Sequence, residues 1–99
     1  SEQMDPIPLD DFKAHPENYT IVDVRMATEA TEYKIFDNAL SIPLDELRHR
    51  IHEIPQNLPV VVHCAGGYRS AAGSSIIAAV LKDHVKAYDL GNAIKQFEP

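Results

Sequence analysis

Short apolar runs alternate with amphipathic stretches along the whole chain, and this pattern predicts its secondary structure. Runs of four to eight residues rich in β-branched side chains are typical of strands, whereas apolar residues three and four positions apart mark one face of a helix. Strands are predicted at 21–24, 39–42, 60–63 and 85–90. Helices are predicted at 9–14, 28–33, 44–54, 70–82 and 91–97, with Thr28 and Ser70 as N-cap residues.

The order of these elements predicts the fold class. Strands that alternate with helices over short connections indicate an α/β fold with a mostly parallel central sheet flanked by helices. The strand at 60–63 begins with three consecutive valines, as expected for a parallel strand covered on both faces. We expect one domain spanning residues 1–99, with residues 1–5 either disordered or left over from cloning.

The composition limits the partners that this chain is expected to bind. The formal net charge of −6 argues against nucleic acids and anionic membranes. No apolar run approaches the roughly 20 residues that span a bilayer. The acidic, polar N-terminus does not resemble a signal peptide, so a cytoplasmic location is expected.

Cys64, the only cysteine, follows the strand at 60–63 and begins a glycine-rich loop. A free cysteine has a pKa of about 8.5, and a helix N-terminus or a nearby cation lowers it towards the nucleophilic thiolate. Gly66 and Gly67 are predicted to take positive φ and turn their N–H groups inward. Arg69 is placed to face back across the loop, and Ser70 opens the helix that follows. The loop therefore predicts a cysteine nucleophile in a cradle that favours anions.

Other polar residues near the strand ends are assigned mainly structural roles. Arg25 either adds a second positive charge to the loop or, with Asp23, forms part of the scaffold. His63 is expected to pack on the opposite side of the sheet from Cys64, because adjacent strand residues point to opposite faces. His49 and His52 are expected to be solvated, and no metal site is predicted.

Several segments resemble the single-domain rhodaneses, a family of thiosulfate and persulfide sulfurtransferases. The resemblance covers nearly the whole chain, in the right order, and is specific because its segments occur together. The matching segments are Ile21–Arg25, Glu32–Tyr33, Ala39–Leu47 and Val61–Ser70. The chain departs from many members at Lys34–Asn38, and it lacks the tryptophan that many members carry near the C-terminus.

The resemblance implies a three-layer rhodanese-like domain and a two-step sulfur transfer. Cys64 would take the outer sulfur of thiosulfate or a glutathione persulfide and pass it to cyanide, sulfite or a thiol. Asp23 and Arg25 would support the site. The loop residues would bind the substrate, and Arg69 would orient its charged end. These loop residues are Ala65, Gly66, Gly67, Tyr68, Arg69 and Ser70.

The same resemblance implies no cofactor, and its partners would be a small sulfur donor and a thiol acceptor. The loop resembles those of rhodanese domains fused to, or found beside, persulfide-metabolising enzymes. Three alternatives remain. The first is a non-catalytic regulatory or interaction module, and the second is a sulfur carrier. The third is a cysteine-based phosphatase or arsenate reductase, which is less favoured because only four residues separate Cys64 from Arg69.

Overall fold

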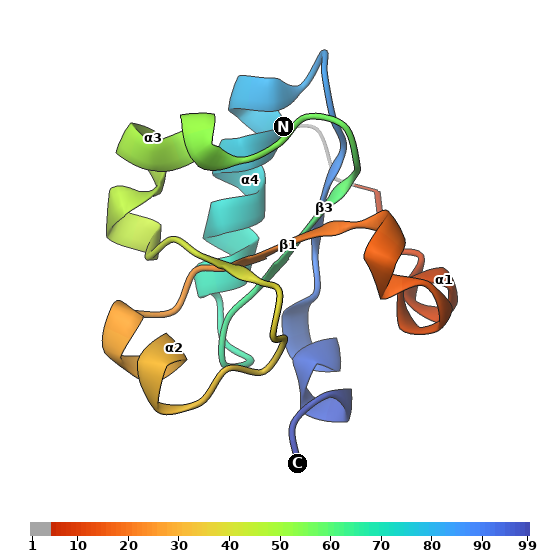
Figure 1. Cartoon of the computed structure of the whole chain (residues 1–99). Coiled ribbons are helices and arrows are strands. Elements are labelled where there is room, and N and C mark those ends of the chain that lie inside the picture. The colour runs from red at the N-terminus through yellow and green to blue at the C-terminus, as the bar shows by residue number, and fades with distance from the viewer. Residues whose placement is uncertain (1–4) are drawn as a thin grey trace.

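A four-stranded parallel sheet forms the centre of the molecule (Figure 1). The computed structural model describes residues 5–99, so the prediction for residues 1–4 lies outside the described part. The strands run in the order β2-β1-β3-β4 and all their pairings are parallel. Their bounds are β1 Thr20–Asp23, β2 Leu40–Ser41, β3 Val60–His63 and β4 Ala87–Asp89. The predicted α/β class with a parallel sheet is confirmed, although β2 and β4 are shorter than the runs at 39–42 and 85–90.

The register between β1 and β3 fixes the relative positions of their carboxyl ends. Thr20 pairs with Val60 and Asp23 pairs with His63, so the two strands end level with each other. The residues that follow β1 and β3 therefore emerge side by side at the carboxyl edge of the sheet. This brings Arg25 into the neighbourhood of Cys64, although the two are far apart in sequence.

Three of the predicted helices are α-helices close to their predicted bounds. They are α1 Leu9–Ala14, α2 Ala27–Glu32 and α4 Arg69–Leu81. The prediction of Thr28 as an N-cap is wrong, because α2 begins one residue earlier with Met26 at the N-cap. The Glu29 carboxylate accepts a hydrogen bond from the Met26 backbone N–H at 3.0 Å. A side chain in the first turn of the helix therefore pairs with a backbone N–H that would otherwise lack a partner at this helix end.

The predicted helix at 44–54 is instead three short helical segments. The 3₁₀ helix η2 (Leu44–Glu46), the α-helix α3 (Leu47–Arg50) and the 3₁₀ helix η3 (Ile51–Glu53) follow one another. A 3₁₀ helix repeats every three residues, and the apolar positions at both ends of this segment are three apart. The predicted helix at 91–97 is likewise the 3₁₀ helix η4 (Gly91–Gln96), and a further one, η1, spans Pro16–Asn18.

Alternate residues of the central strands feed two cores, one on each face of the sheet. In β3, Val60 and Val62 pack with α4 and α3, whereas Val61 packs with α1 and η4. The helices on the two faces are separated by the sheet in Figure 1. Gly73 lets α4 approach closely, since a methyl group there would lie 3.2 Å from Val24 and 3.3 Å from Val62. Gly73 therefore has a packing role.

Candidate active site around Cys64

Cys64 lies directly after β3, and its side chain is almost completely enclosed. Only 1% of the residue is exposed. The backbone N–H of Ser70 donates to Sγ at 3.3 Å, and the Ser70 hydroxyl oxygen lies 3.4 Å from it. The prediction of Ser70 as an N-cap is wrong, because α4 begins at Arg69 and Tyr68 takes the N-cap position. Ser70 instead sits in the first turn, where its backbone N–H donates to the sulfur. Its hydroxyl accepts from the Cys64 thiol and donates to the thiolate once the proton is lost.

Two opposing effects act on the pKa of Cys64. Burial raises the pKa, because a charged thiolate is less well solvated inside the protein. Hydrogen bonds from the Ser70 hydroxyl and from the backbone N–H groups of Ser70, Gly66 and Gly67 lower it. The hydrogen bonds outweigh burial, so the pKa of Cys64 lies below its ordinary value.

The two loop glycines have different conformations. Gly66 has φ +97°, a region that side chains disfavour, and this confirms the prediction for that position. Gly67 does not have positive φ, so the prediction is wrong there. One positive-φ residue is enough to turn the chain here. A methyl group on Gly67 would meet nothing within 4 Å, so this residue borders open space above the loop.

Arg69 does not face the sulfur as a free cation. Its Nη1 and Nη2 donate to the two carboxylate oxygens of Glu29 at 2.6 and 3.1 Å. Hydrogen bonds from Arg69 lower the pKa of Glu29 to about 2, against an opposing effect of burial. Arg69 therefore forms a fork-like ion pair with α2 at the mouth of the loop.

Arg25 is also engaged by a carboxylate, and deeper in the fold. Its Nη2 donates to Asp23 at 2.7 Å, and its Nε lies 3.0 and 3.1 Å from the two oxygens of the same carboxylate. Nη2 also donates to the Tyr33 carbonyl at 2.9 Å. These contacts favour a structural role for Arg25 over a second positive charge at the loop, because its guanidinium is paired with Asp23.

His63 points to the face of the sheet opposite Cys64, as expected from strand alternation. Its ring packs edge-on against Phe36 with centroids 5.1 Å apart, and Nδ1 lies 3.2 Å from the Cys64 carbonyl oxygen. Nε2 is buried without a hydrogen-bond partner, 3.8 Å from an Asp23 oxygen. Burial lowers the pKa of His63, which favours a neutral ring. The position on the opposite face argues against His63 as a base for the thiol.

The remaining loop residues border the solvent. Tyr68 is 84% exposed, and Ala65 is also exposed. The inner side of the loop therefore forms hydrogen bonds with Cys64 Sγ, and its outer side is exposed to solvent.

Sequence reasoning missed two charged neighbours of this loop. One is Glu29, whose local signal was its place four residues after Arg25, in the first turn of the helix there. The other is Lys95 of η4, whose side chain lies against Gly66. No local pattern marked Lys95, because the contact joins distant parts of the chain.

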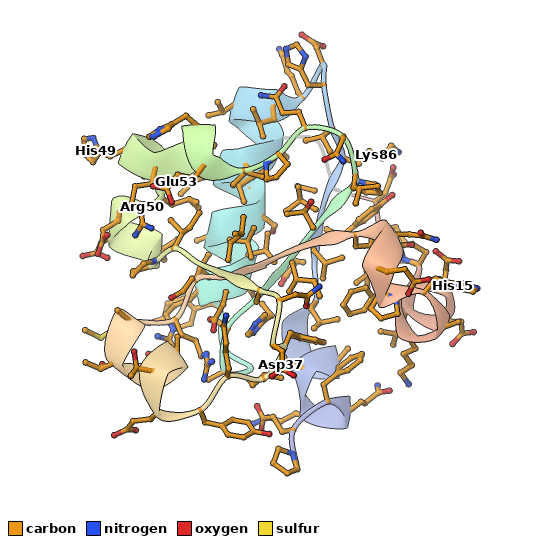
Figure 2. All side chains as sticks on the ribbon, viewed as in Figure 1. His15, Asp37, His49, Arg50, Glu53 and Lys86 are labelled. Atoms are coloured by element: carbon orange, nitrogen blue, oxygen red, sulfur yellow. The ribbon has the colours of Figure 1, made fainter. Side chains whose placement is uncertain are left out.

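The described residues show neither a metal-binding cluster nor a membrane-spanning helix. Within residues 5–99 there is no group of three or more His, Cys, Asp or Glu side chains arranged to hold a metal ion. His49 lies at the periphery in Figure 2, and its acidic neighbours Glu46 and Glu53 both pair with Arg50. No helix in that range combines the length and apolarity needed to cross a bilayer.

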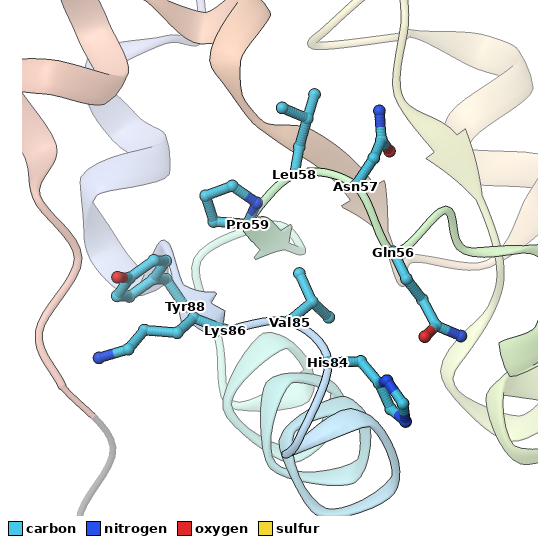
Figure 3. Close-up of a pocket in the computed structure, with 8 residues that line it drawn as sticks. All are labelled: Gln56, Asn57, Leu58, Pro59, His84, Val85, Lys86 and Tyr88. Atoms are coloured by element: carbon cyan, nitrogen blue, oxygen red, sulfur yellow. The ribbon is translucent and has the colours of Figure 1, made fainter.

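A small cavity of about 240 Å³ opens near the amino ends of β3 and β4 (Figure 3). It is lined by the segments 56–59 and 84–86 together with Tyr88. Cys64 follows the carboxyl end of β3, so this cavity is at the opposite edge of the sheet. It therefore does not contribute to the cysteine site.

The comparison with family models identifies this arrangement. The model described as a rhodanese-like domain matches residues 8–97. The chain belongs to the rhodanese-like family. The match extends from before α1 to the end of η4, so it includes the cysteine loop and every strand. It confirms the resemblance drawn from the sequence motifs.

Solved structures with this fold support the same conclusion. A rhodanese-related protein from Thermoplasma volcanium is 26% identical, with a TM-score of 0.76 over 95% of this chain and 94% of that one. A protein from Staphylococcus saprophyticus shares the fold at 22% identity, with a TM-score of 0.71 over 96% and 94% of the two chains.

A third neighbour is a larger protein. An NAD-dependent persulfide reductase from A. fulgidus is 35% identical over 79% of this chain, with a TM-score of 0.60. The matched part is only 14% of that protein. No protein of curated function matches the chain.

Proposed function

We propose that this rhodanese-like domain is a sulfurtransferase that works through a Cys64 persulfide. The observation that carries the proposal is the set of hydrogen bonds around Cys64 Sγ, which lower the pKa of the thiol despite its burial. A thiolate is the form that attacks sulfur, and the N–H groups that stabilise it also suit a persulfide anion.

The reaction proceeds in two displacements. In the first, the Cys64 thiolate attacks the outer sulfur of thiosulfate, a new S–S bond forms, and the old S–S bond breaks with its electron pair leaving on sulfite. In the second, cyanide attacks the outer sulfur of the Cys64 persulfide, and thiocyanate leaves while the thiolate is regenerated. A glutathione persulfide can replace thiosulfate, with glutathione thiolate as the leaving group. Neither step needs a metal or an external oxidant.

The loop residues divide the work between them. Gly66, Gly67 and Ser70 stabilise negative charge on the sulfur through their N–H groups. Gly67 borders the open space through which a donor reaches the loop. Asp23 and Arg25 hold the neighbouring strand end in place.

Intact-mass spectrometry tests the proposal directly. Incubation with thiosulfate is expected to add the mass of one sulfur atom to the wild-type protein, and cyanide is expected to remove it. The Cys64→Ser variant should gain nothing. If neither thiosulfate nor glutathione persulfide adds sulfur to the wild type, the proposal is wrong, and an aryl phosphate and arsenate become the next substrates to test.

A sulfur carrier is the second candidate function, and the burial of Cys64 is the observation that favours it. A persulfide enclosed to this extent is shielded from solvent, which suits a stored sulfur. Thiocyanate formation with excess thiosulfate and cyanide separates the two functions. Many turnovers for each protein molecule indicate an enzyme, whereas one indicates a carrier.

The proposed partners are a small sulfur donor, a thiol acceptor and a fused or neighbouring persulfide-metabolising enzyme. The similarity to one part of an NAD-dependent persulfide reductase supports the last of these. A reducing compartment such as the cytoplasm suits a mechanism that depends on a free thiolate.

A further inference from the structure

Lys95 lies closer to the cysteine loop than its place in the sequence suggests. It belongs to η4, which packs on the face of the sheet opposite α4. A methyl group placed on Gly66 would lie 3.0 Å from Lys95 Cε and 3.3 Å from Nζ. The end of the lysine side chain therefore rests against the backbone of the residue two positions after Cys64.

This ammonium group differs from the two arginines near the site. Arg25 is held by Asp23 and Arg69 is held by Glu29. Within residues 5–99, Lys95 makes no hydrogen bond or ion pair. Its side chain is exposed, so its charge is available to a molecule that approaches the loop.

We propose that Lys95 selects anionic sulfur donors by binding the charged end that leaves after sulfur transfer. The proposal rests on the sulfurtransferase function proposed above. Hydrogen bonds from the backbone N–H groups of Gly66 and Gly67 lower the pKa of Cys64, so these groups stabilise negative charge at the cysteine sulfur. Lys95 lies against the same stretch of backbone and supplies the positive charge for the remainder of the donor.

The chemistry of the first displacement explains why this charge matters. When the S–S bond of thiosulfate breaks, its electron pair moves onto sulfite, which carries two negative charges away from Cys64. A cation beside the loop attracts the donor and stabilises the departing anion. The overall negative charge of the chain opposes the approach of such a donor, so a local cation has a larger role here.

The experiment compares two donors in single-turnover sulfur loading of Cys64, followed by mass spectrometry. Thiosulfate carries a doubly charged leaving group, whereas N-acetylcysteamine persulfide has no anionic group beyond the persulfide itself. Lys95→Gln is expected to slow loading by thiosulfate about fivefold, a size typical of an exposed charge pair. It should slow loading by the second donor less, because the thiolate that leaves carries one negative charge and sulfite carries two. Lys95→Arg should restore the thiosulfate rate.

Lys82→Gln is the matched control. Lys82 is exposed and follows the far end of α4, roughly 20 Å of helix away from the loop. Loading of this variant should equal that of wild type with both donors. The effect of Lys95→Gln should also disappear at about 1 M salt, because screening removes the contribution of an exposed charge.

The outcomes separate this proposal from the one on which it rests. If wild type loads with both donors and Lys95→Gln loads equally well with thiosulfate, Lys95 has no role and the sulfurtransferase function stands. If Lys95→Gln slows both donors alike, its effect is structural and the selectivity is disproved. If wild type loads with neither donor, the sulfurtransferase function fails and the role of Lys95 fails with it.

Discussion

Two arginine–carboxylate pairs lie near the carboxyl edge of the sheet, and they differ chiefly in burial. The side chains of Arg25 and Asp23 are 7% and 1% exposed. Those of Arg69 and Glu29 are 31% and 35% exposed. Both arginines use more than one nitrogen to bind a carboxylate, so the residue types alone do not distinguish the two pairs.

The difference in burial gives the pairs different roles. In the inner pair, Arg25 and Asp23, the Arg25 backbone N–H also donates to Asp23, and the Arg25 guanidinium donates to the Tyr33 carbonyl. The pair therefore fixes the end of β1 to the segment after α2. The outer pair, Arg69 and Glu29, joins α2 to the start of α4, where water competes for hydrogen bonds with both side chains. A buried pair is hard to break because each charge depends on the other, whereas an exposed pair can be remodelled.

Removing the inner carboxylate should have the largest effect. Asp23→Ala leaves the Arg25 guanidinium buried without its counter-charge, and we expect the free energy of unfolding to fall by about 3–5 kcal/mol. Urea unfolding followed by circular dichroism measures this change. Asp45→Ala, at an exposed aspartate, should change it by less than about 0.5 kcal/mol. Equal values for the two variants would show that the inner pair is not part of the scaffold.

The second prediction tests whether the Cys64 thiolate depends on Ser70 rather than on Arg69. Ser70→Ala removes one of the hydrogen bonds that lower the pKa of Cys64, so this pKa should rise. At neutral pH we expect sulfur loading to slow by about tenfold, the typical effect of losing one hydrogen bond to a charged group. The midpoint of the pH dependence of iodoacetamide alkylation reports the pKa.

Two further variants act as controls for this experiment. Ser74→Ala removes a nearby hydroxyl that donates to the Ala71 carbonyl, and it should leave the alkylation midpoint where it is. Arg69→Gln should move the midpoint less than Ser70→Ala does, because the charge of Arg69 is paired with Glu29. A larger shift for Arg69→Gln would mean that the outer pair, and not the hydroxyl, sustains the thiolate.

The sequence predicted the fold and the position of the cysteine because both depend on local patterns. The valine run of β3 and the glycines after it mark a strand that ends in a tight loop, whatever the rest of the chain does. The conformation of Gly66 followed from the same reasoning. These features need no knowledge of distant neighbours.

The partners of the charged groups depend on distant contacts and were not predicted. Glu29 and Arg69 are 40 positions apart, and their pairing depends on how α2 sits beside the start of α4. Ser70 matched the pattern of an N-cap, yet its backbone N–H and its hydroxyl both form hydrogen bonds with the nearby sulfur. Lys95 reaches Gly66 only because η4 folds back beneath the loop.

The third prediction concerns the outer pair. Glu29→Gln keeps an oxygen that can accept the Met26 N–H, so the free energy of unfolding should fall by less than about 1 kcal/mol. The substitution removes a negative charge beside the cysteine loop and leaves the positive charge of Arg69 unpaired. Loading by thiosulfate should therefore become about threefold faster. Glu32→Gln, an exposed acid later in the same helix, is the control and should load at the wild-type rate. Slower loading by Glu29→Gln would mean that the pair itself positions the donor.

The smallest expected effect is the acid dependence of the outer pair, and its sign follows from the pKa of Glu29. This pKa is about 2 in the folded protein, compared with 4.5 for the unperturbed group. Because folding lowers the pKa, the stabilisation is complete above pH 4.5 and is lost as the pH falls towards 2. Urea unfolding at pH 6 and pH 2.5 should therefore show a difference between wild type and Glu29→Gln that shrinks at the lower pH. Since both side chains are about one-third exposed, the change should remain below about 1 kcal/mol. A difference that persists unchanged at pH 2.5 would mean that it does not arise from the charge of Glu29.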